Sequence, residues 1–100
     1  MGTLFYGASR TPIRIDDRIL AHLKLVATSK LRRNEPFLLS WHDSADVGGG
    51  RSSIWVHPSC DLHYKFDGGS QAAIDQDLIE AMSLAANAAR GIEIEEATLR

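Results

Sequence analysis

Alternating apolar and polar positions mark five short strands along the chain. They span Thr3–Tyr6, Pro12–Ile15, Phe37–His42, Ser53–His57 and Leu62–Phe66. Because successive side chains of a strand point to opposite faces of a sheet, each segment presents one apolar face to a core. The turn at residues 7–10 makes a hairpin of the first two strands, and the short connections among the last three favour antiparallel pairing.

Two longer segments repeat apolar residues at spacings of three and four, the pattern of an amphipathic helix. The first begins at Asp16 and Asp17, which supply an N-cap and a first-turn acid, and it runs to about Arg33. At its C-terminal end we expect Lys30, Arg32 and Arg33 to interact with the helix dipole and with solvent.

The second helix is predicted to begin after Asp75 and to end at Arg90 and Gly91, where glycine is a common C-cap. Residues 92–96 then form an acidic tail or a short edge strand. The element order ββαβββα predicts an α+β fold. We expect a single two-layer domain, with a roughly five-stranded, mainly antiparallel sheet that carries both helices on one face.

The chain of 100 residues fits one domain, expected over residues 1–97 with a C-terminal tail at 98–100. Its core is predicted between the apolar strand faces and the two helices. The residues expected there are Phe37, Leu39, Trp41, Ile54, Val56, Leu62, Tyr64 and Phe66, under Leu23, Val26, Leu78 and Met82.

The composition indicates which partners and which cellular compartment to expect for this protein. The formal net charge of −2 gives no bulk attraction to nucleic acid or to an anionic membrane. Cys60 is the one cysteine, so no disulfide within the chain is possible. No stretch has the composition of a signal peptide or the length of a membrane span. We therefore expect a cytoplasmic protein without membrane contact.

Residues 65–68 read Lys-Phe-Asp-Gly and match K-x-D-G, the tetrapeptide that carries the reactive lysine of ATP-dependent DNA and RNA ligases. In such an enzyme Lys65 would accept AMP from ATP with Mg²⁺ as cofactor, and Asp67 would lie beside it. However, ligases usually carry glutamate at the position of His63 and arginine at that of Ser70. Only 32 residues follow Gly68, too few for the other ligase motifs. The favoured interpretation is a strand end that runs into a glycine turn.

A wider resemblance covers nearly the whole chain. The segments that carry it are 1–7, 15–18, 22–24, 30–35, 40–41 and 50–59, which read MGTLFYG, IDDR, HLK, KLRRNE, SW and GRSSIWVHPS. They resemble a family of small actinobacterial proteins of about 100 residues that are often labelled ATP-dependent DNA ligase. The resemblance implies that the same label attaches to this sequence.

The strand faces opposite the core combine aromatic side chains with basic or titratable ones. By alternation they carry Phe5, Arg14, Leu38, Ser40, His42, Trp55, His57, His63 and Lys65. Such a surface suits a protein interface, most simply that of a homodimer. It also suits the stacking of bases and contact with phosphates in nucleic acid, or it is a solvated face with scattered aromatics.

A metal site has one weak candidate in the sequence. His57, Cys60 and His63 form the array H-x-x-C-x-x-H, and His42 is a plausible fourth ligand. The spacing matches no zinc motif known to us, and the alternative is a pair of surface histidines on a hairpin. We therefore expect no metal and no other cofactor.

Taken together, the sequence predicts a small cytoplasmic binding module without catalysis of its own, a homo-oligomer or the partner of another protein. Two alternatives stay open. The first is a ligase-like nucleotidyltransferase fragment that uses Lys65, with ATP and Mg²⁺ as cofactors. The second is a DNA-repair-associated accessory domain that binds nucleic acid through the aromatic and basic strand face.

Overall fold

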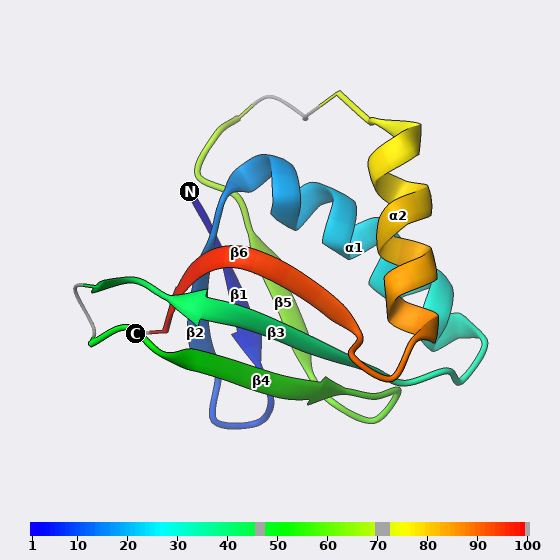
Figure 1. Cartoon of the computed structure of the whole chain (residues 1–100), viewed down its shortest axis with the longest axis horizontal. Helices are drawn as coiled ribbons and strands as arrows, with labels where there is room; N and C mark the ends of the chain where they lie inside the picture. The colour runs from blue at the N-terminus through cyan, green and yellow to red at the C-terminus, as the bar shows by residue number, and fades with distance from the viewer. Residues whose placement is uncertain (46–47, 70–72, 100) are drawn as a thin grey trace.

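The computed structural model describes residues 1–45, 48–69 and 73–99 (Figure 1). Over these residues the elements are β1 (Gly2–Tyr6), β2 (Thr11–Ile15), α1 (Asp17–Arg32), β3 (Phe37–Asp43), β4 (Arg51–Val56), β5 (Leu62–Lys65), α2 (Gln76–Asn87) and β6 (Ile92–Leu99). Neither helix of this described part is long and apolar enough to cross a membrane. The class is α+β, as predicted, in one compact domain.

The strands form two three-stranded sheets, β4-β3-β6 and β2-β1-β5. The end of β6 joins them, because Thr98 and Leu99 pair with Arg14 and Ile13 of β2. Every neighbouring pair is antiparallel except β3 and β6, which are parallel. Figure 1 shows β3, β4 and β6 running across the view in front of β1, β2 and β5, which cross behind them at a steep angle. Both helices lie on the same side of the strands.

The prediction of a roughly five-stranded sheet is wrong, because it leaves out β6. Within this strand Ile92 and Ile94 are buried while Glu93 and Glu95 are exposed, the alternation of a strand with one face on the core. The strand lies in the centre, between β3 and β2, and not at an edge. Its pairing reaches Leu99, within the segment predicted as a tail, and Arg100 lies outside the described residues.

One hydrophobic core connects both sheets and both helices. Its members are Leu4, Ile13, Ile15, Leu20, Leu23, Val26, Ala27, Phe37, Leu39, Trp41, Val56, Met82, Ala86, Ile92 and Ile94. The predicted core residues of β3, and Val56, Leu23, Val26 and Met82, are confirmed as buried. Ile54, Leu62, Tyr64, Phe66 and Leu78 pack against the core while partly buried. The hairpin of β1 and β2 adds Leu4, Ile13 and Ile15 to the core. These three are not among the core residues expected from the sequence.

Both helices begin at the caps that the sequence predicted. The Asp16 carboxylate accepts hydrogen bonds from the backbone N–H groups of Arg18 and Ile19, at 3.0 and 3.4 Å. The Asp75 carboxylate does the same for α2, at 3.0 Å from the Asp77 nitrogen. These bonds satisfy N–H groups that have no acceptor within their own helix. The second helix ends at Asn87, three residues before the predicted cap at Arg90 and Gly91.

A buried histidine joins the two helices. The His22 side chain has 0% exposure; its Nδ1 lies 2.6 Å from the carbonyl oxygen of Arg18, and its Nε2 lies 2.9 Å from the backbone nitrogen of Asp75. Nδ1 therefore donates and Nε2 accepts, which only the neutral ring provides. His22 thus fixes the start of α2 against α1.

A second polar contact joins the other ends of the helices. The Lys30 ammonium donates to Asn87 Oδ1 at 2.6 Å and to Glu35 Oε1 at 3.0 Å. Lys30 is only 5% exposed, so the prediction that it is a solvated charge is wrong. Its apolar stem lies in the helix interface while the charged end reaches two acceptors.

The turn into β6 requires a glycine. Gly91 has φ of +71°, in the left-handed region. A Cβ placed on it would overlap the carbonyl oxygen of Leu38 and would lie 2.8 Å from the carbonyl carbon of that residue. This close approach lets β6 enter its place beside β3.

Candidate functional site

The crossing of the two sheets divides the predicted open face into two surfaces. On the outer face of β2-β1-β5, Thr3 lies between Arg14 and Lys65, and Phe5 lies opposite His63; we call this the Lys65 surface. On the outer face of β4-β3-β6, three cross-strand pairs form the Trp55 surface: Leu38 with Trp55, Ser40 with Ser53, and His42 with Arg51. His57 follows the end of β4, in the connection to β5.

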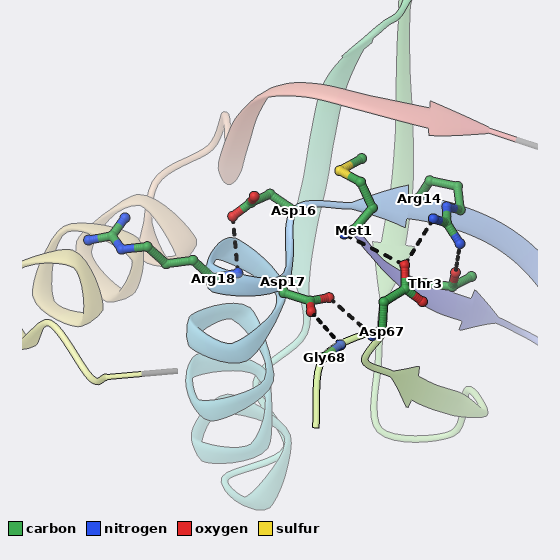
Figure 2. Close-up of polar contacts among 8 residues, drawn as sticks. All are labelled: Met1, Thr3, Arg14, Asp16, Asp17, Arg18, Asp67 and Gly68. Carbon is green, nitrogen blue, oxygen red and sulfur yellow. Dashed lines mark hydrogen bonds and ion pairs between the residues drawn. The ribbon is translucent and has the colours of Figure 1, made fainter. Parts of the chain in front are cut away.

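On the Lys65 surface, the aspartate of the K-x-D-G motif is held by an arginine. Lys65 is the last residue of β5 and is exposed. The Arg14 guanidinium donates to Asp67 Oδ2 and to Thr3 Oγ1, each at 3.1 Å, and the amino group of Met1 lies 3.6 Å from the same Asp67 oxygen (Figure 2). Asp67 therefore ties the end of β5 to β2.

The glycine of the motif is held by the first turn of α1. The Asp17 carboxylate accepts hydrogen bonds from the backbone nitrogens of Gly68, at 3.0 Å, and Asp67, at 3.4 Å (Figure 2). Asp67 and Gly68 thus have contacts that fit the interpretation as a strand end. Ser70, which stands in place of a ligase arginine, lies outside the described residues.

A small aromatic and basic cluster lies at the other end of β5. The Arg10 guanidinium carbon sits 4.6 Å from the centre of the Phe5 ring, and its Nη2 lies 3.1 Å from Nδ1 of His63. The rings of Phe5 and His63 are 5.3 Å apart. Sequence reasoning missed Arg10, because it lies in a turn, with φ of +52°, and strand alternation does not reach it.

The structure gives the candidate metal ligands different partners. Nδ1 of His57 accepts a hydrogen bond from the Ser59 backbone nitrogen at 3.2 Å, and the His57 carbonyl oxygen lies 3.0 Å from the Cys60 sulfur. His63 contacts Arg10. Across the described ranges, no three or more His, Cys, Asp or Glu residues are placed to hold a metal ion.

The Trp55 surface holds an exposed aromatic side chain at a sheet edge. Trp55 is 53% exposed on β4, which has a neighbouring strand, β3, on one side. The Tyr6 hydroxyl donates a hydrogen bond to the Trp55 carbonyl oxygen. Burial, and to a lesser degree the nearby Cys60, raises the pKa of Tyr6, which keeps the hydroxyl protonated as a donor.

Next to Trp55 lies an open polar groove of about 550 Å³. It is lined by Leu38, Ser40, Trp41, His42, Arg51, Ser53, Arg90, Glu93 and Ile94. On its floor the hydroxyls of Ser40 and Ser53 are 2.7 Å apart. Arg90 lies 3.9 Å from Glu93, and both side chains are exposed, so this ion pair is weak. Sequence reasoning missed Arg51, although the alternation of Trp55 and Ser53, extended by two residues, places it on the same face.

These features define a single-domain α+β protein with an aromatic side chain on an edge strand and an open polar groove beside it. The chain belongs to a family described as domain of unknown function DUF7882, whose model matches residues 1–97. No curated protein and no solved structure matched the chain.

Proposed function

We propose that this protein is a cytoplasmic binding module without catalysis of its own, and that it self-associates through the Trp55 surface. The observation that carries this proposal is the half-exposed Trp55 on the edge strand β4. Tryptophan is enriched at protein interfaces, where its large surface leaves water. An edge strand also offers backbone groups that can pair with another strand.

The surroundings of Trp55 support an interface more than an isolated exposed side chain. Leu38 lies directly across from it on β3, which extends the apolar area. The rim carries His42 and Arg51, and the hydroxyls of Ser40 and Ser53 lie between. An apolar centre with a polar rim is the usual composition of a protein interface.

We expect Trp55→Glu to weaken self-association at least about 30-fold, because an interface tryptophan of this kind contributes about 2 kcal/mol or more. The measurement is sedimentation equilibrium of the wild-type and variant chains over a range of concentrations. Leu84→Glu is the matched control, since Leu84 is 73% exposed on α2, away from the groove. A wild-type chain that is monomeric at every concentration, or equal weakening by both variants, would contradict the proposal.

A second candidate function is the binding of single-stranded nucleic acid in the groove beside Trp55. The specific observation is that Arg51, Arg90 and His42 line one groove with two hydroxyls, next to an aromatic ring. Arginine can contact phosphates and tryptophan can stack on a base. Glu93 in the same groove opposes this function by repelling phosphate.

For this second candidate we expect Arg90→Glu to weaken binding of a fluorescent single-stranded oligonucleotide about tenfold, with affinity falling as salt rises. Fluorescence anisotropy at two salt concentrations measures both effects. Arg32→Glu, at an exposed position on α1, is the matched control for the change in net charge. Equal loss with both variants would indicate bulk electrostatics and not a groove.

A direct test distinguishes the ligase-like alternative, with Lys65 as AMP acceptor and Asp67 beside it, from the proposed module without catalysis. The purified protein is incubated with radiolabelled ATP and Mg²⁺ and run on a denaturing gel. A label that stays on the wild-type chain and is absent from Lys65→Ala would establish the transfer and overturn the proposal of a non-catalytic module.

A further inference from the structure

We infer that two copies of this chain pair along their β4 strands, antiparallel and about a two-fold axis at Ser53, so that Arg51 of each copy lies opposite Trp55 of the other. The inference rests on the proposed function. It adds to it the identity of the partner, a second copy, and the register of the pairing.

The backbone of β4 presents hydrogen-bonding groups at its outer edge. In the hairpin of β3 and β4, the Asp43 N–H donates to the Gly50 carbonyl oxygen at 2.9 Å. Because hydrogen-bonded and non-hydrogen-bonded pairs alternate in an antiparallel ladder, Ser52 and Ile54 then bond to β3. The backbone groups of Arg51, Ser53 and Trp55 therefore point away from β3.

The contact at Trp55 agrees with this alternation. The Tyr6 hydroxyl reaches the Trp55 carbonyl oxygen from the side away from β3. A carbonyl oxygen has two lone pairs, so the same group can still accept a bond from a paired strand. The pairing with a second copy therefore uses the outward backbone groups of Arg51 and Ser53, together with the N–H and the second carbonyl lone pair of Trp55.

We infer the register by comparing which residues each possible two-fold axis would set opposite one another. An axis at Ser53 pairs residues 51–55 of one copy with 55–51 of the other, nearly the full length of β4. An axis at Ile54 would pair Ser53 with Trp55 but would set Arg51 against His57, which lies beyond the end of β4. An axis at Ser52 would set Trp55 against Gly49, in the loop that precedes the strand. The axis at Ser53 is therefore the one of the three that gives each outward-pointing residue of β4, Arg51, Ser53 and Trp55, a partner within the strand.

This register also brings together the side chains of Arg51 and Trp55, which lie too far apart to touch within one chain. Arg51 and Trp55 lie on the same face of β4 but are about 13 Å apart along it, at about 3.3 Å per residue. Across the two-fold axis they become direct neighbours, and a guanidinium over an indole ring gives a cation–π contact. The symmetry makes two such pairs, so the surface is complementary to itself.

A disulfide test reports the register directly. In a Cys60→Ala background, Ser53→Cys places one cysteine on the axis, where opposite Cα atoms would lie about 5.5 Å apart, within the range of a disulfide. We expect mild oxidation to give mostly cross-linked dimer on a non-reducing gel. Ser59→Cys in the same background is the control, since Ser59 is exposed in the turn after β4. We expect it to cross-link at least about tenfold more slowly than Ser53→Cys.

A swap of the two side chains gives a second readout. Trp55→Arg would set arginine against arginine and should weaken the dimer about tenfold or more. Adding Arg51→Trp to it restores arginine opposite tryptophan, and we expect most of the lost affinity to return in sedimentation equilibrium. If the wild type is a dimer that Trp55→Glu dissociates, but Ser53→Cys cross-links no faster than Ser59→Cys and the swap is not rescued, the register is wrong and the proposed function stands. A monomeric wild type overturns both.

Discussion

Gly91→Ala is expected to lower the free energy of unfolding by about 3 kcal/mol. About 1 kcal/mol arises because a residue with a Cβ is strained at φ of +71°. About 2 kcal/mol more arises from overlap of that Cβ with the Leu38 carbonyl group, which belongs to the backbone of β3 and cannot rotate away. The measurement is chemical denaturation followed by tryptophan fluorescence or circular dichroism.

Gly7→Ala is the matched control for Gly91→Ala. Gly7 has φ of +77°, nearly the same as Gly91, but a Cβ placed on it would meet no atom within 4 Å. We expect this variant to lose only about 1 kcal/mol, the cost of the backbone conformation alone. If both variants lost the same free energy of unfolding, the Leu38 carbonyl group would not hinder a Cβ at position 91.

His22→Leu is expected to lower the free energy of unfolding by about 2 kcal/mol, because leucine removes the acceptor of the partly buried Asp75 N–H. Leucine fills a similar volume, so the loss reports mainly the hydrogen bonds and not a cavity. His22→Gln, which can offer a carbonyl oxygen to the same N–H, should recover part of the loss. Both variants are measured by chemical denaturation at neutral pH.

His42→Leu is the matched control for His22→Leu, since His42 is exposed on β3 and the same chemical change there removes no buried bond. We expect its effect to stay within about 0.5 kcal/mol of wild type. If His22→Leu were as stable as wild type, His22 would not be the clamp between the helices that its two hydrogen bonds indicate.

Most elements of this fold could be predicted because local signals mark them. Asp16 and Asp75 cap the two helices, and alternation locates β3, β4 and β5. The strand β6 could not be recognised as central, because Glu93 and Glu95, which alternate with its two buried isoleucines, suggest an exposed edge. Only the pairing with β3 and β2 decides where that strand lies.

The candidate site was predictable in part. Alternation correctly placed His42 with Trp55 and Phe5 with His63. It could not show that these pairs lie on two crossing sheets, since the order of strands in space is not a local property. It also missed Arg90, which reaches the groove from the loop before β6 and so depends on tertiary structure.

The central position of β6 has a consequence for how the chain reaches its native state. During synthesis β1 to β5 leave the ribosome before β6, yet β6 is the strand that pairs with both β3 and β2. Until it arrives, those two strands have open edges and the sheets lack their connection. Its partners are distant in sequence, and such contacts slow folding because long loops must close first. Formation of the complete domain therefore waits for the last strand, and the intermediate before that step is the species most prone to aggregation.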